Sequence, residues 1–520
     1  MGITVAILLG QYSIIFVSIL ACAWRILNWV WLKPRRLERL LRQQGLKGNS
    51  YKFFFGDTKE SSMMIKEAKS KPISFSHDIL SRVSPFLHQT VQNYGKGSFI
   101  WFGPIPRVNI METEQIREVF SKFSDFQKPA TNPLVRKLAP GLGNSEGQKW
   151  TKHRKIINPA FHLEKLKRML PAFYQSCSEM ISEWEKLVAL EGSCELDVWP
   201  FLVNLTSDVI SRTAFGSNYE EGRRIFELQN ELASLTKQLT QSVYFPGKRF
   251  LPTKINKKIE KIDKEIEASL KIIINRREKA IKEDHGLASD DLLGILMESN
   301  FREIQENGNN KKFGMSIKDV IEECKLFYFA GKETTSTLLA WTMVLLSKHM
   351  DWQIRAREEV LQLFGNNKPD FDGLNHLKMA NMILYEVLRL YPPGDTLLRT
   401  VTKEMKLGNL TLPAGVQLSL PMIFMHHDPQ LWGEDVTEFK PERFSEGVSK
   451  ATKNKLSFFP FGWGPRICIG QNFALLEAKM ALALVLQNFW FELSSTYAHA
   501  PFPVTTIQPQ YGAHLILHKL

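Results

Sequence analysis

A short segment near the end of the chain, PFGWGPRICIGQN at residues 460–472, most narrows what this sequence can fold into. It places Cys468 between Gly464 and Gly470, two residues after Arg466. Glycines allow tight turns and a close approach of the backbone to a flat group. The five cysteines are scattered, with no Cys-x-x-Cys pair, which argues against a disulfide framework or a zinc site and indicates a reducing compartment. We therefore interpret Cys468 as a functional residue, not a buried structural one.

The composition allows a large core. The chain has 520 residues, of which 44% are apolar and 23% charged, so it is not a disordered protein. A net charge of +13 suggests nucleic-acid binding at first. The charge is uneven, however: between Arg25 and Lys47 there are seven Lys or Arg and a single Glu. This basic stretch directly follows the most apolar part of the chain, which favours a membrane surface over a nucleic acid as its partner.

The apolar part, residues 3–24, contains no charged residue and predicts a transmembrane helix. At 22 residues it would rise about 33 Å, enough to cross the hydrocarbon core. A cleaved signal peptide would begin with basic residues and have a shorter apolar run. The positive flank follows the run instead, which predicts a cytosolic catalytic body and no nucleic-acid role. Pro34 is expected to end the helix and start a hinge. A buried helix or a cleaved signal is the alternative.

Periodicity predicts one mainly α domain with a minor β part, without repeats or Gly/Ser linkers. Helices are expected over 146–190, 204–235, 254–282, 375–391 and 470–489, and over a long segment opened by a Ser316–Asp319 capping box and ending near residue 349. Strands are expected over 99–111 and 396–421, and a closing hairpin over 501–520. The expected division is an anchor at 1–24, a basic, proline-containing hinge at 25–50 and a catalytic domain at 51–520.

Phe461, Gly464, Arg466, Cys468 and Gly470 match F-x-x-G-x-R-x-C-x-G, which resembles the haem-ligand loop of the cytochrome P450 monooxygenases. The resemblance implies a P450 fold, haem b as cofactor, and Cys468 as the axial thiolate ligand of its iron, with Arg466 near a propionate. A helix that starts just after Cys468 should lower the pKa of the thiol and favour the thiolate. A thiolate on haem iron favours O–O cleavage.

Other segments match the family's signatures in the family's order. FYFAGKETTST, from Phe327, places Glu333 and Thr334 where the family has an acid–alcohol pair that relays protons during oxygen activation. Glu386, Arg389 and Arg443 match a buried structural network on the haem side. By the same resemblance, Trp150, Arg154 and Arg399 join Phe461 and Arg466 as haem-binding residues, and the substrate pocket draws on residues 125–140, Leu239, Phe329, Asp395, Leu398 and Val504.

The sequence lacks motifs for binding a nicotinamide or flavin. GLGNSEG at 141–147 does not have the G-x-G-x-x-G spacing, and there is no P-loop or H-E-x-x-H motif. Electrons must therefore come from a separate protein, which the resemblance identifies as NADPH-cytochrome P450 reductase. Lys152, His153 and Lys155 either form part of a basic docking face for it or are merely solvated.

Longer passages, such as HRKIINPAFHLEKLKRMLPAF and LPAGVQLSLP, resemble the plant clade of secologanin synthase and the oleanane triterpenoid oxidases. This resemblance implies a single-pass protein of the endoplasmic reticulum membrane that oxidises a bulky terpenoid. A pentacyclic triterpenoid is the first expectation, and an iridoid or a gibberellin the second. Two other classes remain open, a haem-thiolate isomerase or dehydratase and a non-catalytic haem sensor or membrane scaffold. The retained Glu333–Thr334 pair favours a monooxygenase.

Overall fold

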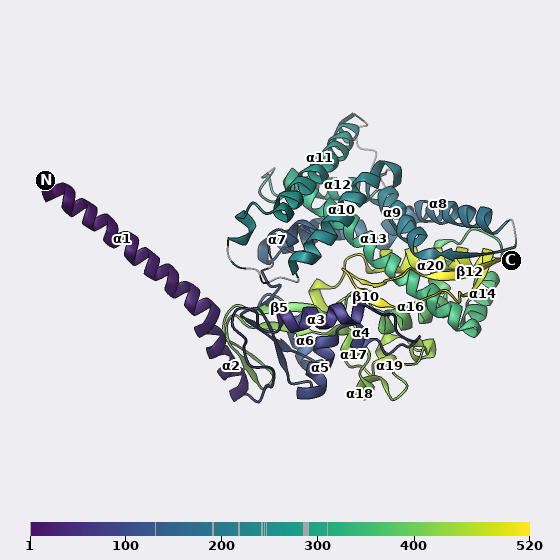
Figure 1. Ribbon diagram of the computed structural model, residues 1–520. Helices are drawn as coiled ribbons and strands as arrows, with labels where there is room; N and C mark the ends of the chain where they lie inside the picture. Colours follow the sequence, from purple (N-terminus) through teal and green to yellow (C-terminus); the bar gives the residue numbers. More distant parts are fainter. Residues whose placement is uncertain are drawn as a thin grey trace.

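One long helix, α13 (Ile317–Lys348), runs through the middle of the molecule and organises the packing around it (Figure 1). It begins at the predicted capping box: the Asp319 N–H donates to the Ser316 hydroxyl at 3.2 Å, and the Ser316 N–H donates to the Asp319 carboxylate at 3.0 Å. Most of its side chains are buried, and they include charged ones such as Glu323, Lys325 and Lys332. The helix is therefore a central support for the elements packed against it.

The protein is described here from a computed structural model, which covers residues 2–130, 132–189, 192–216, 219–240, 243, 245, 247–283, 291–308 and 310–520. Besides α13, the longer helices are α1 (Gly2–Leu27), α2 (Lys33–Gln43), α3 (Thr58–Lys69), α5 (Pro85–Tyr94), α6 (Thr113–Ser121), α7 (Gly147–Ile157), α8 (Leu163–Val188), α9 (Val198–Phe215), α10 (Tyr219–Thr240), α11 (Lys254–Glu283), α12 (Leu292–Glu306), α14 (Met350–Phe364), α16 (Lys378–Leu390) and α20 (Gln471–Asn488). Shorter helices are α4 (Leu80–Val83), α15 (Phe371–His376), α17 (Met422–His426), α18 (Pro429–Trp432) and α19 (Val448–Ala451).

The strands form small sheets at the side of the helical body. The largest sheet has the order β1-β2-β8-β5-β3, in which only the β2–β8 pair is parallel. Its members are β1 (Phe99–Phe102), β2 (Ile105–Asn109), β3 (Phe126–Gln127), β5 (Leu397–Val401) and β8 (Gln417–Leu420). The others are β4 (Ser193–Asp197), β9 (Phe489–Leu493) and β12 (His514–Lys519), the hairpin β10 (Pro501–Pro503) and β11 (Ile507–Pro509), and the hairpin β6 (Met405–Leu407) and β7 (Leu410–Leu412).

The predicted mainly helical architecture with a minor β part is confirmed, and the expected tail is only partly right. β10 and β11 do form a hairpin, but β12 leaves it to lie between β4 and β9. Its alternating burial, with Leu515 and Leu517 inward, suits a strand with one face on the core. The sequence could not reveal this pairing because β4 lies more than three hundred residues upstream.

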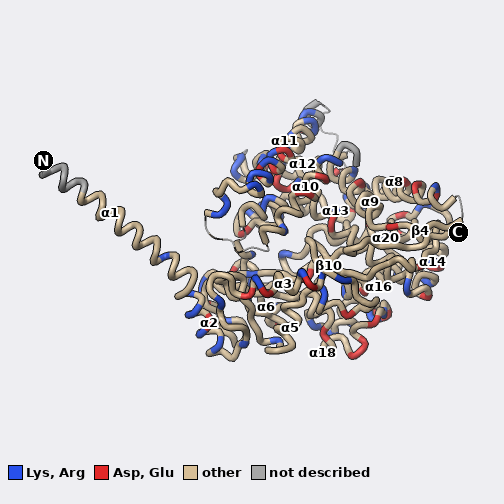
Figure 2. The backbone as a smooth tube through the Cα atoms, in the orientation of Figure 1, with Lys and Arg blue, Asp and Glu red and all other residues tan. Residues whose placement is uncertain are grey.

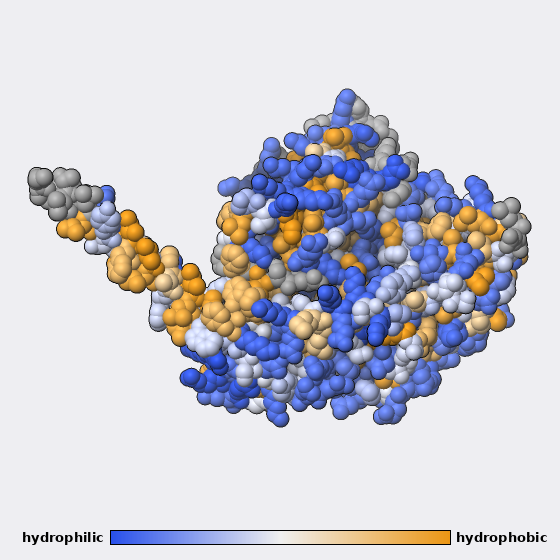
Figure 3. Space-filling model, in the orientation of Figure 1, coloured by the Kyte–Doolittle hydropathy of each residue, from blue (hydrophilic) through white to orange (hydrophobic). Residues whose placement is uncertain are grey.

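Helix α1 projects from the body as a straight rod, and its apolar side chains from Leu9 to Leu27 are exposed (Figures 1 and 3). Within the described residues, the segment from Leu9 to Gln43 is the one helix long and apolar enough to cross a membrane. Lys and Arg gather around α2 at its base (Figure 2). So much apolar surface is unfavourable in water, and this segment is a candidate transmembrane span.

The prediction that Pro34 ends this helix is wrong. The chain continues from α1 through a π-helical turn, Asn28–Leu32, directly into α2, with Pro34 in the first turn of α2. Proline within a helix lacks an N–H and clashes with the carbonyl four residues earlier. The π-turn shifts the hydrogen-bonding register by one residue, so that the Lys33 N–H bonds to the Asn28 carbonyl. The helix therefore tolerates Pro34 without a break.

Candidate functional site

The loop that carries Cys468 is closed by its own backbone just before α20 begins. The Cys468 N–H donates to the Phe461 carbonyl at 2.8 Å. Gly462 and Gly464 have φ of 72° and 73°, values that L side chains rarely adopt. A Cβ on Gly464 would also lie 3.2 Å from the Phe120 carbonyl oxygen, so the turn requires glycine there.

The Cys468 side chain is exposed although protein surrounds it closely. It therefore lines a space inside the molecule. Burial raises the pKa of its thiol above the ordinary value, while the Gly470 N–H and the Arg154 guanidinium act in the opposite direction. The start of α20 does lower this pKa through the Gly470 N–H, as expected, but burial outweighs it and the net shift in the protein alone is upward. A thiolate here needs a cation bound at the sulfur, which a metal ion supplies.

A second set of accessible residues lies in the middle of the otherwise buried helix α13. Leu326 and Ala330 are half-buried and Thr334 is exposed, although their neighbours on the helix are mostly buried. These three residues are four positions apart and therefore share one face. Accessible side chains at the centre of a core helix require an internal space beside them. Thr334 and Cys468 both open onto such space.

Buried and half-buried cations gather beside the Cys468 loop. Four side chains form this cationic cluster: Lys128, Arg154, Arg399 and Arg466. Arg466 donates to the Ser145 carbonyl at 3.1 Å, pairs with Glu146 and lies 4.4 Å over the Trp150 ring, while its buried Nε has no partner among the described residues. Arg154 donates to the Ile467 carbonyl at 2.9 Å, next to the cysteine.

The cationic cluster is strained electrostatically because burial and mutual repulsion act together. Burial and, to a smaller extent, nearby Arg466 lower the pKa of Arg399 to about 10. Burial and the same arginines lower the pKa of Lys128 to about 8. Glu146 opposes these shifts and is the one carboxylate that acts on Lys128, Arg399 and Arg466 within the described chain. The site therefore holds more buried positive than negative charge.

Lys128 was not singled out by the sequence, beyond lying in the 125–140 stretch expected to contribute to the pocket. It follows β3, and its ammonium group contacts the Gly143 carbonyl, while its N–H donates to Glu146 at 3.1 Å. No local motif marks it, since the arginines that shift its pKa lie more than 270 residues further along the chain. Its position can be seen only after folding.

Comparison with known proteins identifies the family. The cytochrome P450 family model matches residues 79–514. The chain is 61% identical to Cytochrome P450 CYP72A219 of Panax ginseng, covering 99% of each chain, and 57% identical to the 7-deoxyloganic acid hydroxylase of Catharanthus roseus, covering 98% of each. Among solved structures it resembles retinoic acid bound cyanobacterial CYP120A1, with a TM-score of 0.72 and 25% identity over 85% of this chain and 96% of that one.

This chain is a cytochrome P450. It belongs to the plant CYP72A clade, it is a monooxygenase, and the family and fold bind haem as cofactor. Membership also implies a redox partner that supplies electrons and a small-molecule substrate. The predicted resemblance, the predicted fold and the predicted cofactor are confirmed.

The residues of this P450 fit a haem on the evidence of their own chemistry. The cationic cluster has too few carboxylates for its charge, and the buried Nε of Arg466 lacks an acceptor among the described residues. Two propionate carboxylates would offset this excess. The accessible Cys468 thiol supplies a soft sulfur donor, which suits iron.

The predicted acid–alcohol pair is adjacent in sequence, yet the two side chains turn to different partners. The Thr334 hydroxyl donates to the Ala330 carbonyl at 2.8 Å. The Glu333 carboxylate is buried and accepts a hydrogen bond from the Thr505 hydroxyl at 2.5 Å. Its ion-pair partner is Lys332, at 3.1 Å. Lys332 therefore takes part in this site, although no sequence motif indicated a functional role for it.

The predicted Glu386, Arg389 and Arg443 lie together. Arg389 forms two hydrogen bonds with Glu386, at 2.7 and 2.8 Å, and both side chains are fully buried. The remaining Arg389 donors reach the carbonyls of His426 and Val436, while Arg443 lies 3.5 Å from Glu386. This arrangement is here called the Glu386 network. Arg443 also pairs with Asp435 at 2.9 Å, so positive and negative charges balance, although the buried Nε of Arg443 forms no hydrogen bond among the described residues.

The predicted pocket residues come from three elements. Phe329 lies in α13, Leu398 lies in β5 with Asp395 two residues before that strand, and Val504 lies in the β10–β11 turn. The first three are half-buried and Val504 is 39% exposed. Burial raises the pKa of the Asp395 carboxyl. Hydrogen bonds from the backbone N–H groups of Asp395 and Thr396 act in the opposite direction but are weaker. Within the described chain no cationic side chain pairs with Asp395.

One of the three residues of the candidate docking face for a redox partner does not lie on the surface. His153 is fully buried, and its Nδ1 lies 2.5 Å from Glu323 of α13, so it ties α7 to α13 and is not on the surface. Lys155 is exposed and pairs with Glu303 at 2.7 Å, and Lys152 reaches the Gly314 carbonyl at 2.8 Å. Both lysines are thus engaged within the chain, and a docking face that includes them stays a prediction.

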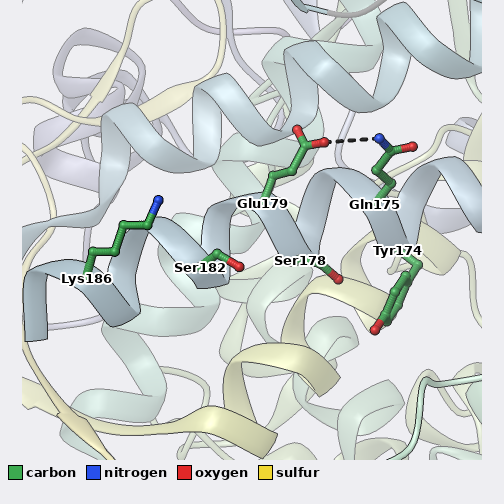
Figure 4. A pocket seen from close by; sticks show the side chains of 6 residues that line it. All are labelled: Tyr174, Gln175, Ser178, Glu179, Ser182 and Lys186. Carbon is green, nitrogen blue, oxygen red and sulfur yellow. Dashed lines mark hydrogen bonds between the residues drawn. The ribbon is translucent and has the colours of Figure 1, made fainter. Parts of the chain in front are cut away.

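A depression of about 550 Å³ elsewhere on the surface is not part of this site. Its lining residues all belong to α8: Tyr174, Gln175, Ser178, Glu179, Ser182 and Lys186 (Figure 4). One helix alone forms it, whereas several elements converge at Cys468. Its one internal contact of note is the 3.1 Å hydrogen bond from Gln175 to Glu179.

Proposed function

We propose that this P450 is a membrane-bound haem-thiolate enzyme of the endoplasmic reticulum that oxidises a bulky plant terpenoid. The preferred substrate class is the pentacyclic, oleanane-type triterpenoids of saponin biosynthesis. Molecular oxygen is the oxidant, and NADPH supplies electrons through NADPH-cytochrome P450 reductase. The observation that carries the proposal is the accessible Cys468 thiol next to a buried cationic cluster with too few carboxylates.

In this proposal Cys468 binds the haem iron, and Arg154, Arg399 and Arg466 hold the propionates together with Lys128. Phe461 and Trp150 pack around the cofactor: Phe461 closes the cysteine loop by accepting from the Cys468 N–H, and Trp150 supports the Arg466 guanidinium. When bound, the haem supplies activation of oxygen and insertion of one oxygen atom into a C–H bond. The Glu386 network keeps the cysteine side of the core in shape.

Thr334 and Glu333 handle protons in this scheme. The Thr334 hydroxyl faces the internal space and holds its own proton on the Ala330 carbonyl at 2.8 Å. The Glu333 carboxylate, one residue away, is the acid that would resupply it. Retention of both groups argues against an isomerase or dehydratase, whose reaction consumes no external protons, and against a non-catalytic haem sensor.

The substrate proposal rests on Asp395. Apolar residues Phe329, Leu398 and Val504 suit a hydrophobic skeleton, and one carboxyl without a cationic partner suits a hydroxyl group on it. An iridoid acid is the second candidate, since one relative, 57% identical, is named a 7-deoxyloganic acid hydroxylase. The Asp395 carboxyl can bond to a substrate hydroxyl whether or not it is ionised, whereas a substrate carboxylate is repelled once Asp395 is ionised, and this favours the triterpenoid over the iridoid acid and over a gibberellin acid.

The test uses microsomes that contain the full chain and the reductase. They receive an oleanane triterpenoid, 7-deoxyloganic acid or a gibberellin in turn, and products are read by mass spectrometry. We expect a product one oxygen atom heavier from the triterpenoid alone. Oxidation of 7-deoxyloganic acid with no triterpenoid product would contradict the substrate class. Replacing Asp395 with Leu should shift the preference toward the acids; unchanged ratios among the three would count against the role of Asp395.

The same proposal places residues 1–24 in the bilayer, residues 25–50 at its cytosolic surface and residues 51–520 in the cytosol. Lys33 and Arg36, with apolar Leu32, Leu37 and Pro413, line a groove of about 380 Å³ at the base of the anchor, at the depth where lipid headgroups lie. Protease added to sealed microsomes should digest the catalytic domain and leave the anchor. Full protection of the domain would reverse this orientation.

A further inference from the structure

The carboxylate of Glu333 is held by the β10–β11 hairpin, far away in the sequence. Its Oε1 accepts hydrogen bonds from the Thr505 hydroxyl at 2.5 Å, the Thr506 hydroxyl at 3.3 Å and the Gln508 side-chain amide. Three donors on one oxygen leave that atom with no capacity for a further proton donor. The hairpin therefore fixes the direction in which this carboxylate points.

The other carboxylate oxygen of Glu333 is held by Lys332 of the same helix, which is in turn fixed by Asn230 of α10. Oε2 lies 3.1 Å from the Lys332 ammonium group, and the same ammonium donates to the Asn230 amide oxygen at 2.6 Å. Lys332 is 4% exposed, so this ion pair is little screened by water. Glu333 is thus clamped on both oxygens, one by the hairpin and one by Lys332.

The hairpin that clamps Glu333 also forms part of the proposed substrate wall. The Trp341 indole N–H donates to the Ile507 carbonyl at 2.6 Å, and the Ile507 N–H donates to the Pro393 carbonyl at 3.0 Å, two residues before Asp395. On its other side, Lys237 of α10 donates to the Pro503 carbonyl at 3.1 Å. A shift of the hairpin would therefore change its contacts with the segment before Asp395, with α10 and with Glu333.

The clamp separates the two members of the proton-handling pair. Thr334 turns to Ala330, whereas both oxygens of Glu333 turn to the hairpin and to Lys332. The Glu333 carboxylate can therefore reach the Thr334 hydroxyl only after the hydrogen bonds to Oε1 break. The position of the hairpin, and not helix α13 alone, then decides when Glu333 faces Thr334.

We propose that Lys332, Thr505 and Gln508 are positioning residues that park the Glu333 carboxylate on the β10–β11 hairpin, so that proton delivery depends on how substrate seats this hairpin. The proposal rests on the proposed function in that Glu333 supplies protons to the haem side. It adds a link between substrate fit and proton supply, which would limit wasteful consumption of NADPH when the pocket is empty.

The experiment uses the full-length holoenzyme with reductase in membranes, and the variants Gln508→Leu, Thr505→Val and the double variant. Thr505 is exposed and Gln508 half-buried, so both changes leave the core intact. Gln510→Leu is the matched control, because Gln510 lies two residues along the same segment and bonds to the Lys69 carbonyl and Arg82 instead. The carbon monoxide difference spectrum verifies equal haem content before comparison.

We expect NADPH oxidation without any terpenoid, with release of hydrogen peroxide, to rise about threefold in the variants and to stay unchanged in Gln510→Leu. Hydrogen exchange should speed up in the 500–511 peptide of the variants, a readout independent of turnover. Unchanged or slower NADPH oxidation in the double variant, or unchanged exchange, would overturn the proposal. Because neither measurement uses a substrate, a wrong substrate class leaves the test intact and is detected separately by the terpenoid panel.

Discussion

Two buried groups of arginines in this P450 are built in opposite ways. In the Glu386 network, Glu386 is bonded twice to Arg389 and lies 3.5 Å from Arg443, and backbone carbonyls take the remaining Arg389 donors. In the cationic cluster, Glu146 is the one carboxylate of the described residues that offsets the charges of Lys128, Arg399 and Arg466. A group with balanced charges is complete as it stands. A group with surplus charge marks where a ligand of opposite charge belongs.

The difference also separates stability from binding. Buried charges persist in a fold only when they are paired and hydrogen-bonded, so removal of one partner from a balanced network leaves an uncompensated charge. Removal of one cation from an overcharged cluster relieves repulsion instead. Substitutions of similar chemistry should therefore damage folding in one region and cofactor retention in the other.

The largest effect is expected from Glu386→Gln. This change leaves Arg389 and Arg443 buried with less negative charge to pair with, at a cost of about 3–5 kcal/mol of folding free energy. We expect little or no haem protein by carbon monoxide difference spectroscopy and a large loss of soluble, protease-resistant chain. The control is Glu442→Gln, whose carboxylate is exposed and lies 3.5 Å from Arg355. Normal haem content in Glu386→Gln would remove the contrast between the two regions.

Cys468→Ser should abolish oxygen insertion without loss of fold. The Glu386 network and the backbone bond from Cys468 to Phe461 do not involve the sulfur, so the unfolding temperature should stay within a few degrees of the parent. The thiolate signature of the carbon monoxide spectrum should disappear. Cys194→Ser, at a half-buried cysteine, should keep both spectrum and turnover. Normal hydroxylation by the Cys468 variant would exclude thiolate ligation.

The sequence predicted what short motifs encode. Cys468 and its glycines, and the capping box at Ser316, are local patterns, and the i, i+3 spacing of Glu386 and Arg389 placed both on one helical face. The hairpin partners of Glu333 lie 172 to 175 residues further on, and no local pattern marks them. Pro34 was misjudged because the sequence does not reveal the π-turn that accommodates it. The direction of the Cys468 pKa was misjudged because burial exceeds the helix-end effect.

Within the cationic cluster, Arg399→Met should weaken haem binding while leaving the folded chain intact. Arg399 is buried and makes one hydrogen bond, to the Leu398 carbonyl at 2.8 Å, so its loss orphans no carboxylate. We expect haem transfer to apomyoglobin to be about tenfold faster, equivalent to about 1.4 kcal/mol. Arg302→Met, at an exposed arginine that pairs with Glu298 at 3.0 Å, is the control and should release haem at the parent rate. Equal rates for both variants would remove Arg399 from the site.

The smallest effect is expected from Lys128 and depends on pH. Burial and two arginines lower the pKa of Lys128 to about 8, so the protein alone disfavours its charged form. Propionates favour that charged form, and the bound haem therefore raises this pKa above 8. As pH rises beyond 8 the lysine loses its proton and its attraction for haem.

Haem release from the parent should therefore accelerate between pH 8 and about 10. Lys128→Met should release haem faster than the parent at pH 7 and show a flatter pH profile. Lys122→Met is the control, because Lys122 is exposed and pairs with Glu118 at 2.7 Å, and its profile should follow the parent. Identical pH profiles for Lys128→Met and the parent would contradict this prediction. The arginines alone would then supply the surplus charge of the cluster, and protonation of Lys128 would not contribute to haem binding.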